Sequence, residues 1–106
     1  MTKKVIVAGV GMIPFKKPGA SENYNVMGEK AARAALEDAG LDYKLVQQAY
    51  VGYVYGDSTA GQAALYGVGL SGIPIFNVNN YCSTGSSALF LARQAVQSGT
   101  IDCAIA

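Results

Sequence analysis

The residue of this sequence with the clearest chemical potential is Cys82. It stands between an apolar run, IPIFNVNN over residues 73–80, and a predicted helix over residues 83–98. A thiol at a helix N-terminus faces unpaired backbone N–H groups and the positive end of the helix dipole, and both favour the thiolate. The same N–H groups can stabilise the oxyanion that forms when a carbonyl bound to the sulfur becomes tetrahedral. Cys82 is therefore the candidate catalytic nucleophile.

A structural role for Cys82 remains an alternative. Free cysteine is among the most buried residue types, so position alone also fits a small core residue. The second cysteine, Cys103, lies in an apolar run with no helix dipole beside it, and we expect it to be structural. The chain also has no histidine, the base that most often activates a cysteine near neutral pH. That absence, and an apolar run that stops at Ala106, predict that the chain is a fragment that ends within a strand.

The composition excludes several classes of function. Hydrophobic residues make up 51% and charged residues 14%, which is typical of a chain that forms a core. A formal charge of +1 gives no electrostatic reason to expect nucleic acid or an anionic membrane as partner. The apolar run over residues 5–13 is too short to span a bilayer, and no small-residue cleavage site follows it. We therefore expect no transmembrane segment and no secretion, with both cysteines as reduced thiols.

The elements that must position Cys82 follow from hydrophobic periodicity. A helix ending at Gly40 is predicted because apolar residues share one face, with Glu29/Arg33 and Arg33/Glu37 as i,i+4 pairs on the other. The remaining segments alternate between apolar β-rich runs and helical patterns, which predicts an α/β fold with a largely parallel sheet. The predicted strands are 4–12, 49–55, 75–79 and 102 onward, and the later helices are 62–70 and 83–98.

Two of these elements carry further expectations. Gly9-Val10-Gly11 invites a dinucleotide-binding fingerprint, but Pro14 replaces the third glycine and a loop follows instead of a helix. A close-packed strand buried on both faces is the better interpretation. The helix over residues 83–98 begins with small polar residues and continues apolar around most of its circumference, which predicts a buried central helix.

The residues around Cys82 resemble a known family. The run NNYCSTGSSALFLARQ is similar to the active-site cysteine segment of thiolases. From about residue 4 to the end, the chain resembles the N-terminus of the sterol-carrier-protein-x (SCP2-type) 3-ketoacyl-CoA thiolases, notably in VIVAGVGMIPF, VGYVYGDSTAGQ and GIPIFNVNN. One departure is Tyr81, where the family carries a smaller polar residue such as asparagine, and this bears on how substrate fits beside the thiol.

The resemblance implies the layered αβαβα thiolase fold, of which residues 1–106 are most of the first βαβαβαββ half. It implies that Cys82 is acylated by a 3-ketoacyl-CoA, that acetyl- or propanoyl-CoA leaves, and that coenzyme A, a substrate, collects the shortened chain. It implies a homodimer (or dimer of dimers) with residues 75–80 near the two-fold axis, no permanently bound cofactor and no metal. The family's histidines and its second reactive cysteine match no residue of this chain, so Cys103 inherits no role.

The expected function is thus an acyltransferase of fatty-acid or sterol side-chain β-oxidation, peroxisomal if eukaryotic and otherwise cytoplasmic. Two alternatives remain. One is a condensing enzyme or an aldolase on the same fold, although relatives that turned to aldol cleavage have lost the cysteine that is present here. The other is a non-catalytic, thiolase-like lipid-binding subunit.

Overall fold

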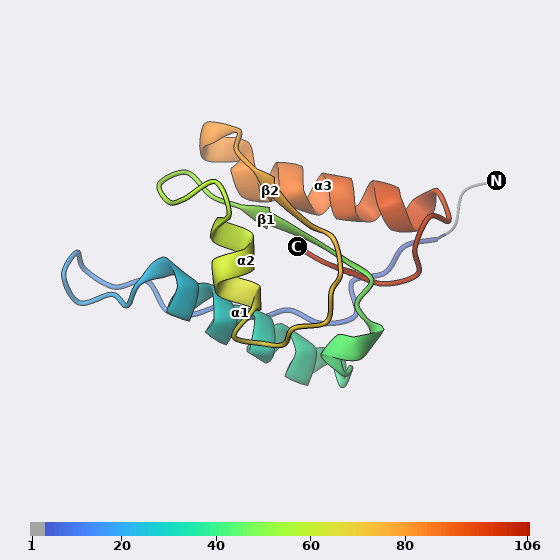
Figure 1. Ribbon diagram of the computed structural model, residues 1–106, viewed down its shortest axis with the longest axis horizontal. Coiled ribbons are helices and arrows are strands. Elements are labelled where there is room, and N and C mark those ends of the chain that lie inside the picture. The colour runs from blue at the N-terminus through green and yellow to red at the C-terminus, as the bar shows by residue number, and fades with distance from the viewer. Residues whose placement is uncertain (1–3) are drawn as a thin grey trace.

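Three parallel strands form the centre of the molecule, and helices cover both faces of the sheet. The computed structural model describes residues 4–106, and its strand order is β2-β1-β3. Helix α3 lies on one face, and helices α1 and α2 lie on the other (Figure 1). The elements are α1 Tyr24–Ala39, β1 Gln48–Gly52, α2 Ala60–Leu65, β2 Ile75–Val78, α3 Thr84–Gln97 and β3 Ala104–Ile105, with short 3₁₀ helices η1 at Tyr43–Leu45 and η2 at Tyr81–Ser83. The predicted α/β class and parallel sheet are confirmed.

The central strand β1 distributes its side chains to the two layers. Successive residues of a strand point to opposite faces. Ala49 is fully buried against Ala32 of α1 and Leu65 of α2. The next residue, Tyr50, packs on the other face against Ala88 and Ala92 of α3. The two cores therefore share one strand, and this strand fixes α3 relative to α1 and α2.

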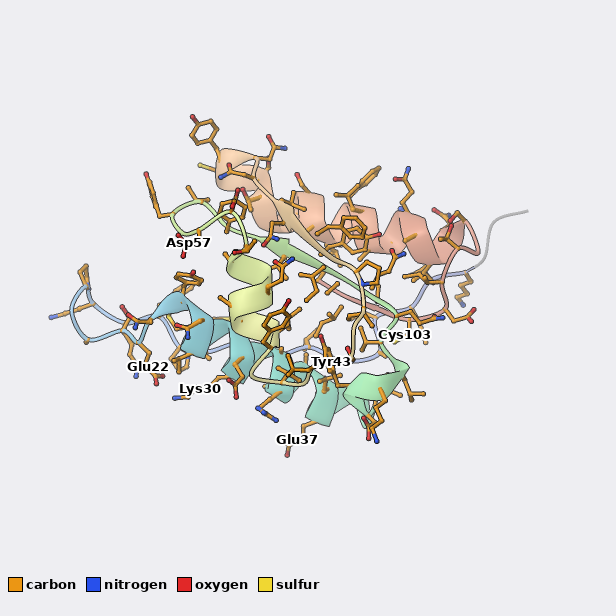
Figure 2. The ribbon with its side chains drawn as sticks, viewed as in Figure 1. Glu22, Lys30, Glu37, Tyr43, Asp57 and Cys103 are labelled. Atoms are coloured by element: carbon orange, nitrogen blue, oxygen red, sulfur yellow. The ribbon has the colours of Figure 1, made fainter. Side chains whose placement is uncertain are left out.

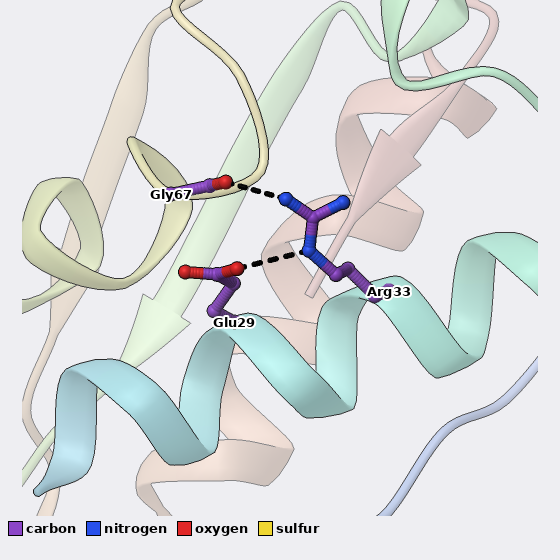
Figure 3. A network of polar contacts seen from close by, with 3 residues as sticks. All are labelled: Glu29, Arg33 and Gly67. Atoms are coloured by element: carbon purple, nitrogen blue, oxygen red, sulfur yellow. Dashed lines mark hydrogen bonds and ion pairs between the residues drawn. The ribbon is translucent and has the colours of Figure 1, made fainter.

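Helix α1 ends as its sequence predicts and is tied to the chain after α2. Gly40 takes the left-handed conformation at φ +66°, and its N–H donates to the Glu37 carbonyl. The Arg33 guanidinium contacts the Glu29 carboxylate at 2.9 Å and donates to the Gly67 carbonyl at 2.6 Å (Figure 3). The Glu29/Arg33 pair is confirmed. Among the described residues no Arg33/Glu37 ion pair forms, since the guanidinium is directed toward Gly67 instead.

The segment 4–12 is the largest departure from expectation, because it forms no strand. It runs along α1, where a Cβ on Gly9 would lie 2.5 Å from the Ala39 nitrogen and one on Gly11 would overlap the Ala31 carbonyl. A backbone packed on a helix makes no sheet ladder, and Val7 and Val10 are each about 70% exposed. The predicted close packing of the glycines is confirmed. The predicted strand buried on both faces is wrong.

The other elements differ from prediction mainly at their ends. Strand β1 stops at Gly52 instead of residue 55, and α2 spans 60–65 instead of 62–70, because Gly67 and Gly69 disfavour further helix. Strand β2 and helix α3 lie within one residue of their predicted ranges. Nowhere between residues 4 and 106 is a helix both long and apolar enough to cross a bilayer.

The burial predicted for the helix after Cys82 is seen within residues 4–106 along one stripe only. Only Thr84, Ala88 and Ala92, spaced by four residues, are buried. Leu89 and Phe90 are 56% and 59% exposed. The reason is that one sheet alone packs on α3, so a single helical stripe is covered.

Candidate functional site

Cys82 lies in η2, the single 3₁₀ turn that joins the carboxyl end of β2 to α3. Its side chain is exposed to solvent. In parallel α/β sheets, ligands bind beyond the carboxyl ends of the strands, which is where this turn lies. The predicted strand–cysteine–helix junction is therefore present, with one 3₁₀ turn inserted before α3.

Asn80 holds this turn against the first two turns of α3. Its carbonyl accepts hydrogen bonds from the N–H and the hydroxyl of Ser83, at 3.1 and 2.9 Å. Its own N–H donates to Thr84 Oγ1 at 2.8 Å, and its Nδ2 donates to Ser87 Oγ at 3.0 Å. Four hydrogen bonds thus surround the residue two positions before the candidate nucleophile.

The residue directly before Cys82 has a strained backbone. Tyr81 has φ +47°, and it is the one non-glycine residue with positive φ in the range 4–106. For a bulky L-residue this conformation costs roughly 1–2 kcal/mol. Its side chain is 81% exposed, so packing of the ring does not offset that cost. The interactions that can offset the strain are the hydrogen bonds of the preceding residue, Asn80, described above.

Thr84 connects the turn to the sheet. Among residues 4–106 it is the one buried residue of the polar or charged types, with 5% of its surface exposed. Its Oγ1 accepts from Asn80 on the β2 side, and its Cγ2 would meet a Cβ on Gly52 of β1 at 2.5 Å. The absence of a side chain at Gly52 is what lets α3 begin this close to β1.

The backbone at Cys82 can serve a developing negative charge. The N–H of Tyr81 is directed at Asn79 Oδ1 and that of Ser83 at the Asn80 carbonyl. For the N–H of Cys82, no partner occurs within residues 4–106. This free donor and the N-terminus of the 14-residue helix α3 lie together. The arrangement suits an oxyanion formed on a carbonyl carbon attached to the sulfur.

A shallow hollow of ≈ 490 Å³ adjoins the turn along α3. Asn80, Ser83 and Ser87 line its polar end, and Phe90 and Leu91 line its apolar end. Hydroxyl and amide groups therefore lie next to the cysteine turn, and apolar surface lies farther along the helix.

Cys103 occupies the opposite end of the sheet. Cys103, labelled in Figure 2, directly precedes β3. The first residue of β3 is in register with Gln48 at the amino end of β1. The Cys103 carbonyl accepts from the Gln47 N–H at 2.9 Å. Burial raises the pKa of the Cys103 thiol, which disfavours the thiolate. The structure does not bring the two cysteines together.

Three residues of the site escaped sequence reasoning: Asn80, Thr84 and Ser87. Their signal was an asparagine at a strand end followed by Ser or Thr at the third, fourth and seventh positions, a pattern of local side-chain to backbone hydrogen bonds. Within the described residues, no three His, Cys, Asp or Glu side chains gather as metal ligands would.

Comparison with known proteins identifies the family. Residues 5–106 match the family described as "Thiolase, N-terminal domain". Over 108 residues the chain is 56% identical to sterol carrier protein 2 of Gallus gallus, covering all of this chain and 20% of that protein. Over 107 residues it is 37% identical to benzoylsuccinyl-CoA thiolase subunit BbsB of Thauera aromatica, covering 99% and 27%. The chain thus spans about one fifth of the length of the first of these relatives.

The solved structures agree on the fold. The acetyl-CoA acetyltransferase from Syntrophomonas wolfei superposes on 94% of this chain and 27% of its own, with a TM-score of 0.70 and 20% sequence identity. The parallel sheet and its helical layers therefore form part of a thiolase fold. With the family match extending from residue 5 through the cysteine turn to residue 106, the chain belongs to the thiolase family, as a part of its N-terminal domain.

Proposed function

We propose that this chain carries the nucleophile of a 3-ketoacyl-CoA thiolase, and that the nucleophile is Cys82. The observation that carries the proposal is the exposed thiol at the N-terminus of α3, beside its own backbone N–H, which has no partner among residues 4–106. Membership of the thiolase family supports it, and one relative, at 37% identity, is named benzoylsuccinyl-CoA thiolase subunit BbsB. The placement of Cys82 at the carboxyl edge of a parallel sheet supports it independently.

The proposed reaction has two halves. The Cys82 thiolate adds to the C3 carbonyl carbon of the 3-ketoacyl-CoA, and the Cys82 N–H stabilises the resulting oxyanion. The C2–C3 bond then breaks as the carbonyl re-forms. The electron pair of the broken bond passes to C2, and C2 takes up a proton as acetyl- or propanoyl-CoA departs. The thiol of coenzyme A then loses its proton and attacks the Cys82 thioester. The bond between the Cys82 sulfur and the acyl carbon breaks, which restores the Cys82 thiolate, and the shortened acyl-CoA leaves. This chain has no histidine, so a histidine that exchanges these protons would come from outside residues 1–106.

The assembly and setting are proposed on weaker support. We propose a homodimer that pairs through β2, because β2 is an outer strand of the sheet and one of its edges has no strand partner among residues 4–106. We propose a role in the breakdown of fatty or sterol-derived acyl chains, peroxisomal if the source is eukaryotic. The support for that is similarity to proteins named sterol carrier protein 2.

Trapping the acyl-enzyme tests the proposal. Full-length protein is incubated with acetoacetyl-CoA without free coenzyme A, quenched in acid and mapped by peptide mass spectrometry. We expect an acetyl group on the peptide containing Cys82, and we expect coenzyme A to remove it. An acetyl group on a different residue, or none while acetoacetyl-CoA is consumed, would overturn the assignment. Condensation of acetyl-CoA without thiolysis would favour a condensing enzyme.

A further inference from the structure

Two hydroxyl side chains of α3 hold the backbone that leads into Cys82. Thr84 and Ser87 are three residues apart, so they lie on neighbouring positions of one helical face. Thr84 Oγ1 accepts from the Asn80 N–H at 2.8 Å, and Ser87 Oγ accepts from Asn80 Nδ2 at 3.0 Å. Asn80 is therefore hydrogen-bonded through its backbone to the Thr84 hydroxyl and through its side chain to the Ser87 hydroxyl.

These two hydrogen bonds to Asn80 lie next to the strained backbone of Tyr81. Tyr81, between Asn80 and Cys82, has φ +47° without any side-chain burial that would hold it there. A strained conformation persists only where the surrounding structure over-determines it. Thr84 is itself fixed, since it is buried and its methyl group lies against Gly52 of β1. The constraint thus passes from the sheet through Thr84 to the turn.

We propose that Thr84 and Ser87 are positioning residues that hold the strained Asn80–Tyr81 turn and thereby aim the Cys82 thiol and N–H. The inference rests on the proposed role of Cys82 as nucleophile. Neither hydroxyl touches the reacting atoms in this scheme. Both act through Asn80, and displacement of a nucleophile by about 1 Å can lower a rate by roughly 100-fold.

Thr84 offers a matched pair of substitutions for the test. Thr84→Val keeps the branched shape and the methyl against Gly52 but removes the acceptor of the Asn80 N–H. Thr84→Ser keeps the acceptor and removes the methyl. Ser87→Ala and Asn80→Ala each remove the same side-chain hydrogen bond from opposite ends. The control is Ser98→Ala, which removes a serine hydroxyl that bonds the Ala95 carbonyl at the far end of α3.

Each variant of the full-length protein is measured for thiolysis of acetoacetyl-CoA and for the rate of Cys82 alkylation by iodoacetamide. We expect Thr84→Val to lower kcat at least tenfold with KM changed less than threefold, and to slow alkylation about fivefold. Thr84→Ser should recover most of both rates, and Ser98→Ala should match wild type. Ser87→Ala and Asn80→Ala should each lower kcat about threefold, and the double variant should be no worse than either.

Three results would overturn the inference. The first is a Thr84→Val protein that retains kcat within twofold. The second is a Thr84→Ser protein as impaired as Thr84→Val, which would assign the effect to packing. The third is a double variant in which the losses in kcat of Asn80→Ala and Ser87→Ala add. If Thr84→Val does not fold, the Asn80→Ala and Ser87→Ala cycle decides alone, since Asn80 is exposed and Ser87 is only half-buried. If wild-type protein shows no thiolysis, the proposed function fails, and the alkylation rates still test the positioning separately.

Discussion

The two cysteines occupy opposite ends of one parallel sheet, in contrasting chemical surroundings. Cys82 follows the carboxyl end of β2, is exposed, and lies at the N-terminus of a helix that extends roughly 21 Å. Cys103 precedes the amino end of β3, is half-buried, and has its pKa raised by burial. We therefore expect the more reactive thiol at the carboxyl edge of the sheet, because parallel strands place helix N-termini at their carboxyl ends and not at their amino ends.

Removing each thiol in turn should give the largest contrast. In the full-length protein, we expect Cys82→Ala to lower thiolysis of acetoacetyl-CoA at least about 10³-fold, because covalent catalysis does not survive loss of the nucleophile. Cys103→Ala is the matched control and should stay within about threefold. Steady-state kinetics with equal protein concentrations, checked by circular dichroism, measure both. Comparable losses in the two variants would remove the distinction drawn between the two ends.

Alkylation should rank the same thiols without any assay of activity. At neutral pH we expect iodoacetamide to modify Cys82 about tenfold faster than Cys103 or more, because the thiolate is the nucleophile and burial disfavours it at Cys103. Peptide mapping at partial labelling gives both rates in one sample. Acetoacetyl-CoA should protect Cys82 alone. Equal labelling of the two thiols would contradict the contrast in exposure and the raised pKa of the Cys103 thiol.

The pH dependence of Cys103 follows in sign from the same burial. Its folded-state pKa is raised, so below the ordinary thiol pKa both folded and unfolded chains carry the neutral thiol. As the pH rises past that value, the unfolded chain ionises first, and the stability contributed by the neutral buried thiol is lost. Labelling of Cys103 in the folded protein should therefore keep accelerating at pH values where labelling of free thiols has levelled.

A smaller effect should test how the Cys82 end is packed. A Cβ on Gly52 would lie 2.5 Å from Thr84 Cγ2 and 3.1 Å from Thr84 backbone atoms, so Gly52→Ala must displace the start of α3. We expect a loss of about 1–3 kcal/mol in the free energy of unfolding, measured by urea denaturation of the full-length protein. Gly85→Ala is the control, because nothing lies within 4 Å of its Cβ position and alanine favours the helix. A Gly52→Ala protein as stable as wild type would show that α3 is not held by this contact.

Helices α1 and α3 show how far periodicity alone predicts packing. Both were predicted within a few residues of their observed ends, and Gly40 and Gly99 take the left-handed conformations that end them. The apolar face of α1 is covered as expected through Ala32. On α3, an apolar circumference predicts a central, buried helix, and within residues 4–106 one stripe of it is covered while Leu89 and Phe90 are exposed. Composition shows that a surface is fit to be buried, and only the arrangement of layers decides what covers it.

The sequence by itself determined the alternation of strands and helices, the junction at Cys82 and the resemblance to thiolases, because each depends on residues close together in the chain. The tertiary structure alone decided what depends on distant contacts. It set segment 4–12 against α1 rather than in a sheet, placed Gly52 beneath Thr84, and closed Asn80 between Thr84 and Ser87. An extended apolar run has the same local pattern whether its backbone meets a strand or a helix. A hydrogen bond to a threonine hydroxyl exists only once a sheet has fixed that threonine in place.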